Sequence, residues 1–307
     1  MSNARLAFPL VPRSRVIGIS FGTMRSLHRG AGSDLAGSRP YRPGDDMHTI
    51  DWATSARIST ARGQDEFIVR EKFAEEAPKI VIVCDRRPQM GYFAAPLPWL
   101  DKVQTMRNTV ELILASAGAA GGFVGYLDYA DGHPHWRQPK GERKLIELKD
   151  ERLWSSEYGG PEDWFERTLA HLAEHPRAAS PGTFIFLLSD FLPSPGREVW
   201  LDALAHRWDV VPVVIQDPTW EQSFPDVSGV VLPLRDPESG RVTHVRLRKK
   251  EAEERTAANE ARLSELIETF RVLDLDPVVL SSSDKSDILA EFLVWTALRR
   301  TRRVIGA

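Results

Sequence analysis

The sequence predicts an α/β protein with a doubly wound, mostly parallel sheet, preceded by an N-terminal appendage of loops and a strand. Continuous apolar runs, typical of strands covered on both faces, alternate along the chain with segments whose apolar residues recur every three or four positions. Such alternation favours parallel strands joined by right-handed helical crossovers. The chain has 307 residues, of which 42% are hydrophobic, so it can bury a substantial core.

We expect residues 1–77 to form the appendage and residues 78–307 to form the α/β domain. The turn-rich stretch 29–62 indicates a structured loop with short elements, and the alternating stretch 66–73 indicates a strand. In the domain, strands are expected at 79–85, 122–129, 183–190, 209–217 and 276–282, and helices at 99–117, 162–175, 197–207, 249–273 and 286–300. Two further extended stretches, 229–236 and 241–248, predict a hairpin at the sheet edge.

Charge and cysteine content exclude several classes of protein. Forty basic and 43 acidic residues leave a formal net charge of −3, which indicates neither a nucleic-acid surface nor a membrane surface. The single cysteine, Cys84, excludes an intramolecular disulfide framework and fits a reducing compartment, so a cytoplasmic location is expected. No signal peptide or transmembrane segment is visible.

Two aspartates each end a predicted buried strand. Asp85 follows IVIVC and Asp190 follows FIFLLS. Ligands of open α/β sheets gather at the carboxyl ends of strands, so neighbouring strands would turn both carboxylates toward one crevice and make a magnesium site possible. The alternative is that each aspartate caps the helix or turn that follows it.

Several segments together resemble the family catalogued as domain of unknown function 58. They are GSRPYRPGDDMHTIDWATSAR (37–57), KIVIVCD, FIFLLSDFL, DVVPVVIQDP and LPLRDPESG, and the likeness runs from about residue 30 to residue 300. The resemblance implies a von Willebrand factor A-like domain and, as a partner, a MoxR-type AAA+ ATPase. It also implies a divalent cation held by Asp-x-Ser-x-Ser, a later Thr and a later Asp.

This chain departs from that ligand pattern. Asp85 and Asp190 match the two aspartates, but Arg87 and Gln89 occupy the serine positions, and Pro161 or Glu162 stands where the threonine hydroxyl is expected. The resemblance therefore implies a degenerate metal site, for which we expect no cofactor. One hypothesis is that the Arg87 guanidinium replaces the cation between the two aspartates; the alternative is that it points into solvent.

Two groups of residues are candidates for contact with a partner. The loop 88–100 is unusually apolar: Tyr92 and Phe93 are expected to be exposed, and Trp99 and Leu100 are expected to begin the buried helix. The motif RPYRPGDDMHTIDW either supports the α/β body or docks the ATPase. Its candidate residues are Arg39, Tyr41, Arg42, Asp45, Asp46, Asp51 and Trp52.

The function expected from the sequence is a non-catalytic interaction adaptor acting with a MoxR-type ATPase. The alternative is a Mg²⁺-dependent enzyme that uses Asp85 and Asp190 on a phosphorylated substrate. No phosphate-binding glycine loop or nucleophile elbow supports catalysis. The arginines at 299, 300, 302 and 303 are expected to complement the dipole of the last helix, with peripheral membrane association as the alternative.

Overall fold

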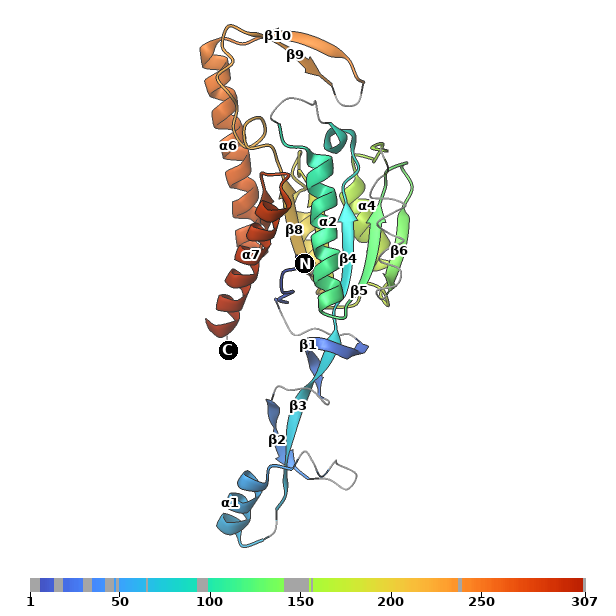
Figure 1. Ribbon diagram of the computed structural model, residues 1–307, viewed down its shortest axis with the longest axis vertical. Helices are drawn as coiled ribbons and strands as arrows, with labels where there is room; N and C mark the ends of the chain where they lie inside the picture. Colours follow the sequence, from blue (N-terminus) through green and yellow to red (C-terminus); the bar gives the residue numbers. More distant parts are fainter. Residues whose placement is uncertain are drawn as a thin grey trace, which may run out of the picture.

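The computed structural model of the protein describes residues 6–13, 19–29, 35–41, 47, 50–64, 66–92, 99–140, 155, 157–236 and 239–305. At its centre is a six-stranded sheet with the order β11-β8-β7-β4-β5-β6, parallel throughout except for β6 (Figure 1). The strands are β4 (Lys79–Cys84), β5 (Phe123–Asp128), β6 (His135–Lys140), β7 (Phe184–Ser189), β8 (Asp209–Ile215) and β11 (Val278–Leu280). The predicted α/β class with a mostly parallel sheet is confirmed.

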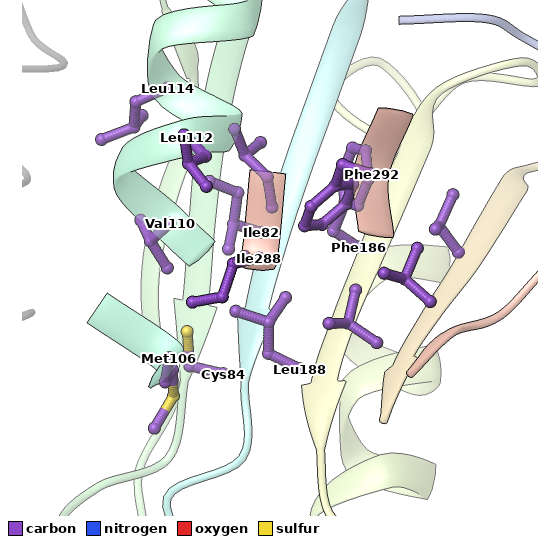
Figure 2. Packing of buried hydrophobic residues seen from close by; sticks show 14 of the residues in the cluster. Ile82, Cys84, Met106, Val110, Leu112, Leu114, Phe186, Leu188, Ile288 and Phe292 are labelled. Carbon is purple, nitrogen blue, oxygen red and sulfur yellow. The ribbon is translucent and has the colours of Figure 1, made fainter. Parts of the chain in front are cut away.

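Helices cover both faces of this sheet. On one face lie α2 (Lys102–Ala119) and α7 (Lys285–Ile305), and on the other lie α4 (Trp164–Ala173), α5 (Arg197–Ala205) and α6 (Lys249–Val272). Because successive strand residues point to opposite faces, Ile82 packs with α2 and α7 (Figure 2), whereas Val81 and Val83 pack with α4, α5 and α6. This burial on both sides explains why the central strands are continuous apolar runs.

The strand order reverses between β4 and β7. From β4 the chain moves to β5 on one side, then returns across β4 to β7, β8 and β11 on the other. Cys84 at the end of β4 pairs with Leu188 of β7, and the Asp85 amide donates to the Leu188 carbonyl at 2.9 Å. The residues that follow these two strands therefore meet at the switch point, where ligands of open sheets usually bind.

The appendage contains a second, antiparallel sheet with the order β1-β3-β2. It consists of β1 (Ile19–Arg29), β2 (Leu35–Pro40) and β3 (Ile68–Ala77), and α1 (Trp52–Arg62) lies at its far end from the α/β body (Figure 1). Only Pro78 separates β3 from β4, so the two sheets are joined by nearly continuous strands.

Residues 6–13, which fall within the predicted appendage, pack instead on the α/β body. Phe8 is buried and stacks on Phe292 of α7 with ring centroids 4.3 Å apart. Its amide donates to Ser116 Oγ of α2 at 2.9 Å. The start of the described chain thus contributes to the core between α2 and α7.

Two expectations about sheet edges were wrong. The hairpin formed by β9 (Val231–Arg235) and β10 (Val242–Arg246) is a separate two-stranded sheet, because β11 and β6 occupy the edges of the main sheet. Strand β6 was missed, since HWRQPK is a partly buried edge strand without a regular apolar alternation. No helix in the described part of the chain is long and apolar enough to cross a membrane.

The arginines at the chain end do more than complement a helix dipole. Arg299 is 2% exposed, and its guanidinium contacts Asp209 at 2.9 Å and Asp276 at 3.0 Å. It also donates to the carbonyl of Val11 at 3.0 Å, which fixes the N-terminal segment against α7. Two carboxylates offset the cost of burying this cation, an arrangement that helix-dipole reasoning did not anticipate.

We predict that Arg299→Met lowers the free energy of unfolding by about 3–5 kcal/mol, because it leaves two buried carboxylates without their cation. Arg300→Met is the matched control: Arg300 is exposed on the same helix, so its loss should change stability little. Urea unfolding followed by circular dichroism measures both. Equal stability of the two variants would contradict a structural role for the Arg299 ion pairs.

Candidate functional site

Asp85 and Asp190 meet at the switch point, with the guanidinium of Arg87 between them. Arg87 Nη2 lies 2.7 Å from Asp85 Oδ2 and 3.2 Å from Asp190 Oδ1, and Arg87 Nε lies 3.1 Å from both oxygens of Asp85. All three residues are at most 2% exposed. The arrangement joins two neighbouring strand ends through one side chain, and Arg87 does not point into solvent.

A second cation extends this network. Lys102, at the first position of α2, places Nζ 2.9 Å from Asp190 Oδ2 and also contacts Glu221 Oε1. Glu221 accepts a hydrogen bond from the Asp217 amide at 2.8 Å through its other oxygen. Acidic and basic groups therefore alternate along a buried row, which we call the ion-pair row: Asp85, Arg87, Asp190, Lys102 and Glu221.

Local hydrogen bonds hold the row in place. Ser189 Oγ donates to Asp85 Oδ2 at 2.7 Å and accepts from the Phe191 amide at 2.9 Å. Arg87 Nη1 donates to the Leu192 carbonyl at 3.0 Å, which ties the turn after β4 to the turn after β7. These contacts fix the side chains of the row at the carboxyl edge of the sheet.

The electrostatics keep both cations charged. Burial by itself lowers the pKa of Lys102, but the carboxylates of Asp190 and Glu221 outweigh it and raise this pKa above its usual value. Burial similarly opposes the charge of Arg87, whose pKa is nevertheless raised by Asp85 and Asp190. Burial raises the pKa of Glu221, and Lys102 partly counteracts this rise.

These residues do not fit a bound Mg²⁺. Hard divalent cations need carboxylate and other oxygens with free lone pairs, whereas the oxygens of Asp85 and Asp190 already accept from Arg87, Lys102 and Ser189. Gln89, at a serine position of the implied pattern, donates to the Leu192 carbonyl at 3.1 Å. Among the described residues, no three His, Cys, Asp or Glu side chains are grouped as a metal site.

The segment implied to offer a threonine lies directly against the turn after β4. The Gly160 amide donates to the Arg86 carbonyl at 2.9 Å, and a Cβ at Gly160 would lie 2.9 Å from the Arg86 carbonyl carbon. Glu162, one of the two residues at the hydroxyl position, contributes to the raised pKa of Arg87. At this position an acid, rather than a hydroxyl, favours the charge of Arg87.

Sequence reasoning missed Lys102 and Glu221. A weak signal existed for Lys102, because a lysine in the first turn of a helix opposes the helix dipole and is unfavourable without a nearby acid. Glu221 lies in the turn after β8 and reaches the row only through the tertiary fold. No local pattern distinguishes it from a surface glutamate.

The apolar loop after the site is described only in part. Tyr92 is 41% exposed, and Phe93 lies outside the described residues. Leu100 is buried as expected, but Trp99 is 39% exposed and contacts Trp220 edge-on at 5.3 Å, so the expectation that it is buried was wrong. It lies two residues before Asp101, the N-cap of α2, and so outside the helix.

The appendage motif has a polar scaffold. Asp51 caps α1 by accepting from the Thr54 amide at 3.1 Å, and Ser55 Oγ accepts from the Ile68 amide of β3 at 2.8 Å. Residues Arg39 and Tyr41 join the same strand through the backbone: Arg39 pairs with Val69, and the Tyr41 amide donates to the Phe67 carbonyl. Arg42, Asp45 and Asp46 lie outside the described residues.

This scaffold presents two aromatic rings to solvent. Trp52 is 58% exposed and Phe67 is 44% exposed, and the rings meet edge-to-face with centroids 5.9 Å apart. Met47 nearby in the sequence is 64% exposed. Large exposed apolar side chains on a hydrogen-bonded scaffold are typical of contact surfaces.

Comparisons with known proteins place the chain among relatives without an assigned role. The family model "Protein of unknown function DUF58" matches residues 37–265. The uncharacterized proteins Rv1480 of Mycobacterium tuberculosis and Mb1516 of Mycobacterium bovis are each 24% identical over 297 residues, covering 97% of this chain and 89% of theirs.

Two solved structures are more distantly similar. The conserved hypothetical protein BatB from Bacteroides thetaiotaomicron has a TM-score of 0.42 and 16% identity, covering 72% of this chain and 99% of its own. An aerotolerance-related membrane protein from Bacteroides fragilis has a TM-score of 0.42 and 15% identity, covering 70% and 98%. Neither likeness is close enough to transfer a site or a role.

We predict that Arg87→Ser lowers the free energy of unfolding by about 3–5 kcal/mol, because Asp85 and Asp190 would repel each other in a buried crevice. The matched control is Gln89→Ser, which changes the other serine position but removes only a hydrogen bond and should cost about 1 kcal/mol. Chemical denaturation compares the two. A stable Arg87→Ser variant would mean that the guanidinium does not hold the carboxylates.

We also predict that Cys84 is unreactive in the native protein. Burial raises the pKa of this thiol to about 12, despite the opposing charge of Arg86, so almost no thiolate exists at pH 8. A disulfide reagent that releases a coloured thiolate should label one cysteine per chain only after unfolding. Rapid stoichiometric labelling of native protein at pH 8 would show that the end of β4 opens to solvent.

Proposed function

The chain belongs to the DUF58 family, and from that premise we propose that it is a non-catalytic protein-interaction adaptor built on a von Willebrand factor A-like domain. In this proposal Arg87 and Lys102 replace the divalent cation at the switch point. The observation that carries it is the position of Arg87 Nη2, within 3.2 Å of a carboxylate oxygen on each strand end.

The chemistry of the ion-pair row supports an interaction role rather than catalysis. A bound metal activates water or polarises a substrate because it has a coordination position to spare. A guanidinium whose donors are engaged by Asp85, Asp190 and Leu192 has no such capacity. Its permanent charge instead gives the crevice a fixed shape.

Exposed aromatic side chains support the adaptor role from a different part of the molecule. Trp52 and Phe67 are held at the far end of the appendage by the hydrogen bonds of Asp51 and Ser55. Aromatic anchors contribute much of the binding energy in protein interfaces. The partner implied by the family resemblance is a MoxR-type AAA+ ATPase.

The first test measures metal dependence. Titration calorimetry with Mg²⁺ should give no tight binding to the wild-type chain, and its unfolding midpoint should be the same in EDTA and in excess Mg²⁺. Tight, stoichiometric Mg²⁺ binding would overturn the proposal and favour the alternative, a Mg²⁺-dependent enzyme acting on a phosphorylated substrate through Asp85 and Asp190.

The second test measures the interaction. Purified MoxR-type ATPase from the same source should be retained by the tagged chain both with ATP and with EDTA. Trp52→Ala should reduce retention about tenfold or more if the ring is a hot spot, whereas Leu201→Ala, which removes another exposed side chain on α5, should not. Retention lost in EDTA, or absent altogether, would contradict a metal-independent adaptor for this ATPase.

A further inference from the structure

The β9–β10 hairpin projects beyond the α/β body at the end of α6 (Figure 1). Its sheet has only two strands among the described residues, so each strand has one edge whose main-chain groups lack a partner strand. A lone two-stranded sheet is marginally stable in water, and an unpaired edge is a template for another strand. The two edges are not equivalent.

The register shows which main-chain groups point outward. The Asp236 amide donates to the Arg241 carbonyl, so Asp236 and Arg241 form a hydrogen-bonded pair. Hydrogen-bonded and non-hydrogen-bonded pairs alternate along an antiparallel ladder. The main-chain groups of Pro233 and its partner His244 therefore point away from the opposite strand of the hairpin. Pro233 has no N–H, which blocks the outer edge of β9 at its centre. The edge of β10, centred on His244, remains open.

The exposed face of the hairpin combines apolar and basic side chains. Val231 and Val242 are 54% and 44% exposed, and they share this face with exposed His244 and Arg246 because strand residues alternate between faces. The strand residues that share this face, 231, 233 and 235 of β9 and 242, 244 and 246 of β10, include two arginines and a histidine but no acid. This face of the hairpin therefore combines basic groups with uncovered apolar side chains.

We propose that the open edge of β10 binds an extended segment of a partner protein that carries acidic and apolar residues on the same face. The segment would add as a third strand: its backbone pairs with the outward groups around His244, a carboxylate lies near Arg246, and an apolar side chain on that face covers Val242. This deepens the adaptor role proposed above and rests on it, by naming a surface and the chemistry of its partner.

Other occupants fit these features less well. A second copy of the chain would bring two basic hairpins together, which is electrostatically unfavourable. A nucleic acid or an anionic membrane would satisfy the arginines but would leave the backbone groups of β10 without a strand partner. Strand addition is the arrangement that uses the open edge, the valines and the charge together.

The test uses the full-length chain and a fluorescein-labelled short peptide whose every second residue is in turn Val and Glu, with Thr between them, so that Val and Glu share one face of the strand. Binding is followed by fluorescence anisotropy. We expect binding that weakens with salt, and affinity lower by about tenfold or more for a matched peptide with Lys in place of Glu. A peptide N-methylated on the residues that face β10 should not bind. Equal binding of the Glu and Lys peptides, or no binding of either at millimolar concentration, overturns the proposal.

A pair of variants separates the backbone from the side chain. His244→Pro removes the outward N–H without removing a hydrogen bond of the hairpin, so it should abolish peptide binding, whereas His244→Ala should retain it. Should His244→Pro fail to fold, the N-methylated peptide tests the same bond on wild-type protein. Unchanged binding by folded His244→Pro overturns strand addition.

Two further measurements would identify a different occupant of this surface and so overturn the proposal. Self-association that His244→Pro abolishes would identify a second copy as the occupant. Phosphatidylserine vesicle binding that survives His244→Pro but is lost in Arg241→Glu/Arg246→Glu would identify a lipid surface. None of these variants alters the ion-pair row. Failure of peptide binding would therefore overturn only the strand-addition proposal, whereas tight Mg²⁺ binding would overturn the proposed function itself.

Discussion

The ion pairs of Arg87 with Asp85 and Asp190 are the constraint on which the carboxyl edge of the sheet depends. Asp85 and Asp190 follow the paired strands β4 and β7, and Arg87 Nη2 lies 2.7 and 3.2 Å from their oxygens, so the carboxylates are about one strand spacing apart, roughly 5 Å. At an effective dielectric constant of 20, two like charges at that distance repel by about 3 kcal/mol. The strand order that brings the two carboxylates together therefore also requires a cation between them. Arg87 supplies this cation from the same turn as Asp85.

The ion-pair row also links elements that are distant in sequence. Lys102 connects the first turn of α2 to the end of β7 and, through Glu221, to the turn after β8. At the C-terminal end of the chain, Arg299 of α7 joins the start of β8 and the turn before β11 to the N-terminal segment. In both places the cation is long enough to reach two acids from different elements, and burial makes the pairing obligatory because an unpaired charge there is costly.

The central sheet was predictable because burial on both faces leaves a continuous apolar run in each strand, as in β4 and β7. The partly buried β6 and the mostly exposed α1 carry no such pattern; Ser55 is the only buried residue of α1. The local pattern predicted the two strands of the hairpin but not that they form a separate sheet. Sheet membership depends on which edges of the main sheet are already occupied by other strands. Asp85 and Asp190 were predictable from their places at strand ends, whereas Lys102 and Glu221 meet them only after α2 packs against the sheet.

Fixed cations at the switch point have a consequence for where a partner binds. Ligands gather at this edge in α/β proteins because it normally offers free polar groups, but here the oxygens of Asp85 and Asp190 are occupied by side chains of the same chain. Exposed apolar groups lie on two projecting parts, the ring pair of Trp52 and Phe67 on the appendage and the valines of the hairpin, and others lie on the body, as on α7. Under the proposed function, these projections bind partners while the ion-pair row keeps the body between them rigid. Because the cations are covalently part of the chain, the proposed function requires that this rigidity does not vary with the supply of a metal ion.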